Sequence, residues 1–165
     1  MTAEDVIAIL RLFTDTDLTA WLDGGWGIDA LIGDVGREHS DLDLVLRADP
    51  ERARDVLADA GFTSVLRDWL PTALAVADAD GREIDLHPVT PTEDGGGDQP
   101  QLDGTAFHYP PPVPGVIDGV GVWCVDPATQ VRCHLGYEPS AKDRRDMARL
   151  RRRFGIDLPA PYGPV

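Results

Sequence analysis

The chain of 165 residues is long enough to bury the core of one domain, and its 42% hydrophobic and 27% charged residues are ordinary for a soluble globular protein. Its net charge of −14 disfavours nucleic acid as a partner and would attract a cationic small molecule, although the same acidity can serve solubility alone. The two cysteines fit neither a zinc site nor a secreted disulfide framework, and no basic leader or bilayer-length apolar run is visible, so we expect a cytoplasmic protein without membrane contact.

The N-terminal part predicts a helix, a short strand and a second helix. A stripe of apolar residues marks a helix over Thr2–Phe13, with the threonine as its cap and Asp5 at the reciprocal capping position. A strand over Ala20–Asp23 then enters the glycine turn Gly24–Gly27, and a helix over Ile28–Ile32 follows. A glycine turn at a helix N-terminus can bring backbone N–H groups close to an anion, although paired glycines more often only form turns.

The run Asp41-Leu42-Asp43-Leu44-Val45-Leu46 is the most informative stretch of the chain. Because side chains alternate faces along a strand, Asp41 and Asp43 share one face and the leucines the other. Two carboxylates in adjacent same-face positions repel each other unless a positive group lies between them. The natural partner is Mg²⁺, which prefers oxygen ligands and is commonly held by one or two carboxylates plus substrate phosphates.

Arg37 and His39 lie between the glycine turn and the two acids. Either side chain could contact a phosphate or orient the acids. Either could equally belong to a solvated loop with local salt bridges. The pattern alone leaves both roles open.

Residues 49–88 predict a helix and three strands. Asp49 caps a helix that begins with Pro50 and runs to residue 60. Strands are expected over residues 62–67, 72–77 and 82–88, the last two joined by a hairpin turn.

The strand over residues 82–88 places Glu83, Asp85 and His87 on one face, with apolar residues between them. Taken alone, this alternation is typical of an edge strand with one wet face. Beside the first acid pair, Asp85 would instead supply a third carboxylate and complete a metal site.

The C-terminal part predicts loops, one strand and two helices. Residues 90–104 are rich in glycine, proline and aspartate, so we expect a loop without regular structure there and a stiff extended turn over residues 109–114. A strand over residues 119–125 and a helix over residues 128–135 follow.

The last predicted helix covers Ser140–Phe154, with Ser140 as its cap and Asp143 at the reciprocal position. Its arginines, Arg149 among them, suit the negative end of a helix dipole.

Three acids, a glycine turn at a helix N-terminus and flanking basic side chains together favour phosphoryl transfer. In such sites metal ions neutralise developing charge, and a carboxylate can accept the proton of an attacking hydroxyl. The sequence lacks the Walker lysine motif, the protein-kinase signature and the Gly-x-Ser-x-Gly elbow, which disfavours those enzyme classes.

Four motifs carry a family resemblance: LDGGWGIDAL at residues 22–31, REHSDLD at 37–43, IDLHP at 84–88, and HLGY at 134–137 followed by Asp143 and Asp146. Together they resemble the antibiotic nucleotidyltransferases of the polymerase-beta-like superfamily. The resemblance is strongest to the short, A-type lincosamide nucleotidyltransferases and weaker to the aminoglycoside enzymes. It covers nearly the whole chain, and the joint motif is specific although each piece alone is not.

The resemblance implies an α/β (α+β) fold of the polymerase-beta-like type, with a small mixed sheet that carries the acids and is flanked by helices. It also implies a nucleotidyltransferase domain over residues 1–125, with a short C-terminal helical segment over residues 126–165 packed on it. The two parts would form a single compact unit.

The implied activity is transfer of a nucleoside monophosphate from an NTP, with ATP favoured, to a hydroxyl of an amine-bearing antibiotic, releasing pyrophosphate. Asp41 and Asp43 would bind Mg²⁺. Asp85 matches the third acid of the family and would be a metal ligand or the general base. Glu83, on the same strand, is a rival for the base.

Gly24 and Gly25 would face the triphosphate of the bound nucleotide. Arg37 and His39 match the family motif by position, which assigns them to the nucleotide site. Three further residues could line the nucleotide pocket: His134, Tyr137 and Lys142. The histidine and the tyrosine among them could equally pack the C-terminal helices against the sheet.

The identity of the acceptor is the part of the implied activity that the sequence constrains least. A lincosamide is favoured, but an aminoglycoside or a biosynthetic small molecule would use the same chemistry, and residues 91–114 depart from the family pattern. A catalytically silent relative that binds a nucleotide or a partner protein is a further alternative, although three intact carboxylates argue against it. A homodimer is compatible with the sequence, but no motif demands one.

Overall fold

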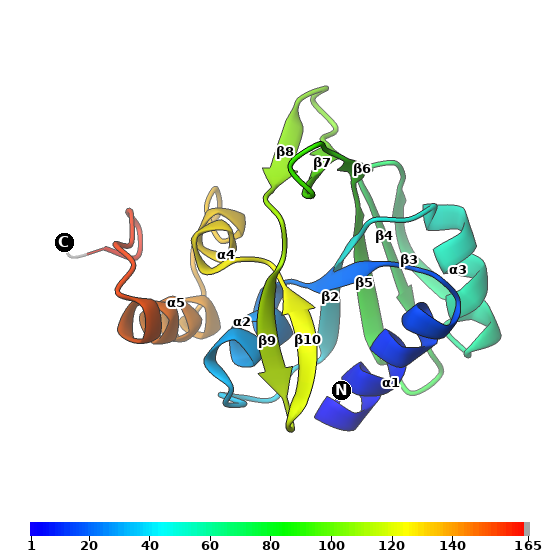
Figure 1. Ribbon diagram of the computed structural model, residues 1–165, viewed down its shortest axis with the longest axis horizontal. Coiled ribbons are helices and arrows are strands. Elements are labelled where there is room, and N and C mark those ends of the chain that lie inside the picture. The colour runs from blue at the N-terminus through cyan, green and yellow to red at the C-terminus, as the bar shows by residue number, and fades with distance from the viewer. Residues whose placement is uncertain (164–165) are drawn as a thin grey trace.

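The computed structural model describes residues 1–163, and a mixed seven-stranded sheet forms its centre (Figure 1). The strands run in the order β3-β4-β5-β2-β1-β10-β9. The β2–β5 and β1–β10 neighbours are parallel, whereas the other neighbours are antiparallel. These strands are β1 (Ala20–Leu22), β2 (Asp41–Leu46), β3 (Ser64–Trp69), β4 (Ala73–Ala77), β5 (Glu83–Pro88), β9 (Val113–Ile117) and β10 (Val120–Cys124).

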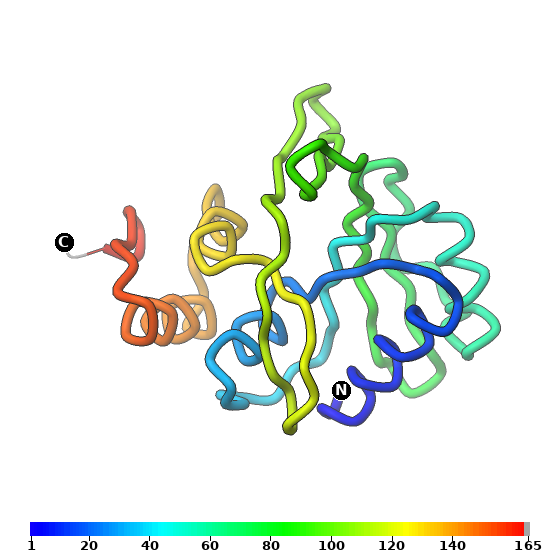
Figure 2. The backbone as a smooth tube through the Cα atoms, viewed as in Figure 1, coloured from blue at the N-terminus to red at the C-terminus, as the bar shows by residue number. Residues whose placement is uncertain are grey.

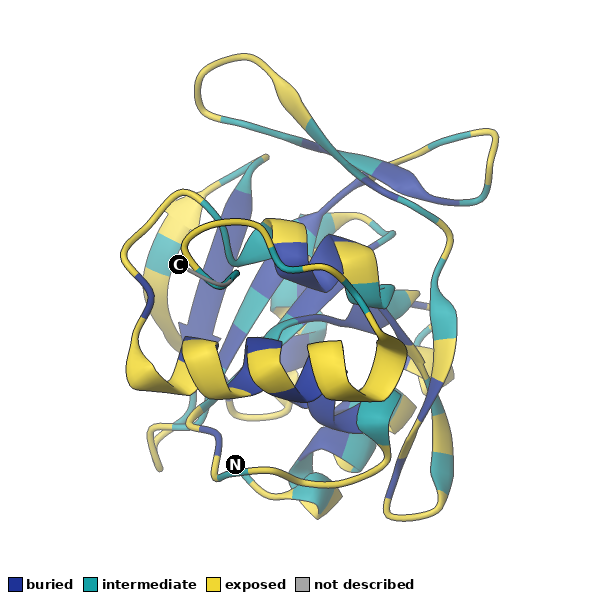
Figure 3. Cartoon of the chain, turned by 90° about the vertical axis from the view of Figure 1, so that its left-hand side faces the viewer, coloured by how far each residue is buried: buried dark blue, intermediate teal, exposed yellow. Residues whose placement is uncertain are grey.

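The helices lie around this sheet, and the main core forms on one of its faces. They are α1 (Ala3–Asp15), α2 (Gly24–Ile32), α3 (Pro50–Asp59), α4 (Pro127–Cys133) and α5 (Ala141–Phe154). The buried leucines of β2 pack with apolar residues of α1, α2 and α3, including Phe13 and Leu57. α5 packs beside α2, and Figure 3 shows its outward side exposed and its inward side buried. The acids of β2 alternate with these leucines and therefore lie on the opposite face.

Local capping signals set most helix boundaries as predicted. Capping boxes join Thr2 to Asp5 at the start of α1 and Ser140 to Asp143 at the start of α5. α2 differs from the prediction, because it begins at Gly24 and not at residue 28. The preceding aspartate accepts a 2.8 Å hydrogen bond from the Gly24 N–H, so the helix includes the glycines that the sequence suggested were a turn.

The prediction of a structureless loop over residues 90–104 is wrong. Strands β6 (Thr90–Pro91), β7 (Gly97–Pro100) and β8 (Ala106–Tyr109) form a second, antiparallel sheet. His108 binds Asp98 at 2.7 Å and Asp94 at 3.1 Å, which ties β8 to β7 and to the turn before it. The strands are only two to four residues long, so the glycines and aspartates of the turns dominate the composition and mask them.

The stiff turn predicted over residues 109–114 leads into β9, a strand that the sequence analysis did not identify. Pro114 lies within β9 opposite Trp123 of β10. β9 is at the edge of the sheet, where a missing N–H is tolerated. The tube in Figure 2 shows the chain leave the main sheet after β5, pass through the small sheet and return in β9 and β10.

The C-terminal helices contact the sheet region through α2. α4 and α5 both pack on α2, with Met147 and Leu150 of α5 buried against Ile28. A division of the chain near residue 125 stays a prediction. Within residues 1–163, none of the helices is both long enough and apolar enough to span a bilayer.

The core beneath the acids provides a test of the fold. Leu44 is fully buried in β2 and opposes Leu86 of β5. We expect Leu44→Ala to lower the free energy of unfolding by about 3 kcal/mol, because it leaves a cavity under the β2–β5 pair. Leu66→Ala, at a β3 side chain that is 55% exposed, should change it by less than about 0.5 kcal/mol. Urea unfolding followed by circular dichroism measures both, and equal losses would contradict this core assignment.

Candidate active site

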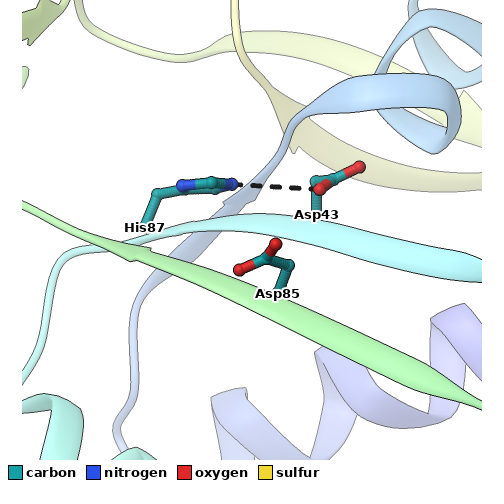
Figure 4. Close-up of side chains that lie close together, drawn as sticks. All are labelled: Asp43, Asp85 and His87. Atoms are coloured by element: carbon teal, nitrogen blue, oxygen red, sulfur yellow. Dashed lines mark ion pairs between the residues drawn. The ribbon is translucent and has the colours of Figure 1, made fainter. Parts of the chain in front are cut away.

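The parallel register of β2 and β5 brings the predicted acids together. Asp43 lies opposite Asp85, and Asp41 lies opposite Glu83. Paired residues of neighbouring strands share a face, so four carboxylates project from the same side of the sheet. Figure 4 shows Asp43 and Asp85 side by side on neighbouring strands, with His87 beside them.

Asp43, Asp85 and His87 form a cluster whose ligand atoms all lie within 4.8 Å of one another. His87 Nε2 is 3.8 Å from Asp43 Oδ1, so the ring pairs with one of the acids. Among the described residues, Asp85 Oδ1 is buried without a hydrogen-bond partner. Two close carboxylates with a free buried oxygen fit a hard divalent cation better than they fit an ordinary surface.

Arg67 of β3 partly compensates the negative charge. Its Nη1 lies 2.5 Å from Asp85 Oδ2, and its guanidinium also lies over the ring of Trp69. Burial nevertheless raises the pKa of Asp85, with Asp43 adding to the effect, although His87 and Arg67 act in the opposite direction. Arg67 could not be identified from the sequence, because one arginine in an exposed strand carries no distinguishing signal.

A second pair of acids, Asp41 and Glu83, extends the negative charge along β2 and β5. Burial raises the pKa of Glu83, and the neighbouring Asp85 and Asp41 raise it further. Asp41 lines the adjoining cleft, two residues before Asp43 on the same face of β2. Its role as a metal ligand stays a prediction, as does the choice between Asp85 and Glu83 as base.

The pKa of His87 is also shifted. Burial alone would lower the pKa of this imidazole, but the nearby carboxylates Asp43, Asp23 and Asp85 outweigh burial and raise it. The sequence placed His87 on the same strand face as Asp85, and that alternation was the signal for including it in the site.

The N-terminus of α2 closes one side of the acid cluster. Gly24 has φ +55°, and a Cβ at this position would lie 2.9 Å from Asp43 Cγ. A Cβ on Gly25 would lie 2.7 Å from Arg37 Nη2 and would overlap the ring of His39. Both positions therefore require glycine, and the first turn of α2 lies directly against Asp43.

Arg37 and His39 occupy different environments. Arg37 lines the cleft, and its Nε donates a 3.0 Å hydrogen bond to Asp146 of α5. His39 is buried, with its Nε2 2.6 Å from Asp29 Oδ2 and its ring tilted against Trp26 at 4.7 Å between ring centroids. The structure places Arg37 in the cleft that the acids of β2 also line, but places His39 behind α2; nucleotide binding by either residue stays a prediction.

Asp23, a buried residue that was not predicted to belong to the site, supports the N-terminus of α2. Asp23 caps α2 through Oδ1, while Tyr109 Oη donates to its Oδ2 at 3.4 Å and Cys133 Sγ lies 3.7 Å away. Burial raises the pKa of Asp23, and the charge of Asp43 adds to this effect. The aspartate immediately before two glycines was the available signal, because it is a favoured N-cap residue.

A cleft of about 1080 Å³ opens over these groups. One side is formed by the acids, α2 and Arg37, and another by the small sheet, including Leu102 and Phe107. His134, Tyr137 and Lys142 also line it, and His134 Nδ1 approaches the backbone oxygen of Gln130 at 2.8 Å. The cleft is large enough for a nucleotide and a second small molecule.

Comparison with solved structures confirms the predicted fold. The crystal structure of the lincosamide antibiotic adenylyltransferase LnuA, lincomycin-bound, is 27% identical with a TM-score of 0.82, covering 92% of this chain and 97% of that one. The crystal structure of ANT(2")-Ia in complex with adenylyl-2"-tobramycin is 19% identical with a TM-score of 0.65, covering 91% and 87%. The second similarity, at this low identity, supports the fold alone.

Sequence comparison agrees with this result. A lincosamide resistance protein of Staphylococcus haemolyticus is 27% identical over 154 residues, which are 92% of this chain and 95% of that protein. The sequence model of the aminoglycoside-2''-adenylyltransferase family matches residues 5–150. This chain therefore belongs to the aminoglycoside-2''-adenylyltransferase family of antibiotic nucleotidyltransferases.

Proposed function

We propose that the chain transfers a nucleoside monophosphate from a nucleoside triphosphate, ATP in the first instance, to a hydroxyl of a lincosamide, and releases pyrophosphate. The observation that carries this proposal is the pairing of Asp43 with Asp85 across β2 and β5, directly beside Gly24 at the start of α2. Carboxylates beside a helix N-terminus combine a cation site with an anion site, which is what a metal–triphosphate complex requires.

In this proposal the nucleotide lies along the first turn of α2. The Gly24 N–H already donates to Asp23, so the Gly25 N–H is the backbone donor that faces the phosphates, and the absence of side chains at both glycines allows close approach. Arg37 lies beside Gly25 and provides a guanidinium for the same oxygens. His39 supports this turn from behind, because its ring lies against Gly25 while its Nε2 contacts Asp29 one turn further on.

Asp41 and Asp43 are the residues that would hold Mg²⁺, and Asp85, although it belongs to the same cluster as Asp43, is assigned to the proton of the acceptor. The bound ion would neutralise charge on the triphosphate and on the leaving pyrophosphate. His87 supplies a nitrogen, which Mg²⁺ accepts less readily than oxygen, so we assign it to the ion pair with Asp43.

Asp85 is the proposed general base. The acceptor hydroxyl oxygen bonds to the α-phosphorus, the bond from that phosphorus to the β-phosphate breaks, and pyrophosphate leaves. The hydroxyl proton passes to Asp85, whose raised pKa makes the carboxylate a better proton acceptor. Glu83 is the second candidate, since its pKa is raised as well.

The similarity to LnuA and to the staphylococcal lincosamide resistance protein favours a lincosamide as the acceptor. The family description, which names an aminoglycoside adenylyltransferase, supports an aminoglycoside as the second candidate. Both classes carry amines that suit a chain of net charge −14, so charge does not separate them.

A direct test incubates the protein with ATP or GTP, Mg²⁺ and a panel of lincosamides and aminoglycosides, followed by mass spectrometry. We expect lincomycin and clindamycin to gain the mass of one nucleoside monophosphate, with stoichiometric pyrophosphate and no reaction in the presence of a chelator. Modification of aminoglycosides alone would overturn the acceptor assignment, and no modification of any compound would overturn the proposed activity.

Substitution of Asp43 and of Asp85 should have different effects on nucleotide binding and on turnover. Asp43→Asn should weaken Mg²⁺-dependent binding of a non-hydrolysable ATP analogue at least about tenfold, because a metal ligand is lost. Asp85→Asn should keep this binding but lose about 10²- to 10⁴-fold in kcat, because the proton acceptor is lost. Titration calorimetry and initial rates separate the two effects. Asp59→Asn, at an exposed residue of α3, is the matched control, and an Asp85→Asn variant with normal kcat would transfer the base role to Glu83.

Gly24 provides a backbone test. Gly24→Ala should abolish turnover to below about 1% of wild type, because its Cβ would collide with Asp43 at a backbone angle that favours glycine. Gly121→Ala in β10 adds the same methyl group in open space and should keep normal rates. Equal activity of the two variants would contradict the proposed contact between α2 and the acid cluster.

A further inference from the structure

A buried network of charged side chains connects α5 to the cleft. Its members are Asp29, Arg37, His39, Asp146 and Arg149, which come from α2, the segment before β2 and α5. Arg149 was predicted to complement the dipole of its helix, but it is buried instead and donates to Asp29 of α2. The network therefore joins α5 to α2 and to the segment before β2.

Asp146 is the point where this network reaches Arg37. It is 1% exposed, and its Oδ2 lies 3.0 Å from both Nε and Nη2 of Arg37. Its Oδ1 lies 3.8 Å from Arg149 Nη1 and has no hydrogen-bond partner among residues 1–163. The carboxylate thus fixes two nitrogens of one guanidinium and leaves little freedom for its orientation.

The rest of the network holds Asp146 and its helix in place. Arg149 donates to Asp29 Oδ1 and, at 2.6 Å, to the backbone oxygen of Asp34. Asp29 also contacts His39, and although burial acts to raise its pKa, the hydrogen bonds from His39 and Arg149 outweigh burial and lower it. Gly36 allows this approach, since a Cβ there would overlap the Arg149 guanidinium.

Arg37 is the one member of the network that lines the cleft. Its side chain is 16% exposed, and its Nη2 lies directly behind Gly25 at the start of α2. A guanidinium at a helix N-terminus adds a fixed positive charge to the positive end of the helix dipole. Without Asp146 the long arginine side chain would have several rotamers, and most would not direct it to this position.

We propose that Asp146 is a positioning residue, which holds the Arg37 guanidinium at the start of α2 so that it binds the phosphates of the nucleotide. This inference rests on the proposed function and extends it to α5. Asp146 does not contact the nucleotide itself; it acts only through Arg37.

A double-mutant cycle tests this dependence. Asp146→Ala and Arg37→Ala should each raise the KM for ATP about tenfold, as is common when a supporting partner of a ligand group is lost, with little change in the KM for the acceptor. The double variant should be no worse than Arg37→Ala, because Asp146 has no effect once its arginine is absent. Calorimetry with a non-hydrolysable ATP analogue provides the same cycle as binding constants.

An ion pair elsewhere controls for loss of stability. Asp78 lies in the turn between β4 and β5 with its side chain 6% exposed, and its carboxylate lies 2.6 Å from Arg82 Nη2. Asp78→Ala should lower the Tm but leave the KM for ATP unchanged. Should Asp146→Ala fail to fold, Asp146→Asn, which keeps the shape and one acceptor oxygen, enters the same cycle.

The outcomes separate the two proposals. Additive losses in the double variant, or an Asp146 variant that changes only Tm, would overturn the positioning role while nucleotide transfer by the wild type stands. A wild-type chain that binds no nucleotide would overturn the proposed function together with this inference.

Discussion

The site depends on one constraint, the parallel register that places Asp43 opposite Asp85. Like charges in directly opposed positions are unfavourable, and burial of Asp85 increases the cost, as its raised pKa records. Arg67 and His87 offset only part of this repulsion, because Asp85 Oδ1 still lacks a hydrogen-bond partner in the described structure. The sheet therefore carries negative charge that its own side chains do not fully compensate, and a bound cation would reduce the repulsion between the two carboxylates. Such unrelieved repulsion beside an otherwise well-packed core is typical of a functional site.

α2 connects this acid pair to the rest of the molecule. At its first turn, Gly24 lies against Asp43 and the capping Asp23 is buried. One turn further on, Asp29 binds both His39 and Arg149, so the same short helix contacts the acid strand and α5. A helix fixed at both points has little freedom to move, which suits a site whose backbone N–H groups must be preorganised. Gly24, which permits close approach to Asp43, and Asp29, whose ion pairs fix the helix, therefore act together to hold α2 beside the acids.

The sequence predicted the features that follow from periodicity and missed those that depend on tertiary contact. Alternation along residues 41–46 and 82–88 correctly placed the acids on one face, because a one-residue shift would have buried them. The small sheet was missed, since its strands are short and its turns supply most of the glycines and aspartates. Arg67 and Arg149 were not identified as site or network residues, because only the fold brings them to Asp85 and Asp29. Predictions from a single sequence are therefore strong for strand faces and weak for long-range ion pairs.

Under the proposed function, the cleft must accept two ligands of opposite charge on a chain with a net charge of −14. A triphosphate is repelled by the protein as a whole, so its binding depends on local positive groups: the α2 N-terminus, Arg37, Lys142 and the metal. An amine-bearing acceptor is attracted by the same overall field, which acts over distances up to a Debye length of about 8 Å at physiological ionic strength. Salt would then weaken the attraction of the acceptor while reducing the repulsion of the nucleotide. The Arg37–Asp146 pair is important in this balance because it fixes one of these positive groups at the start of α2.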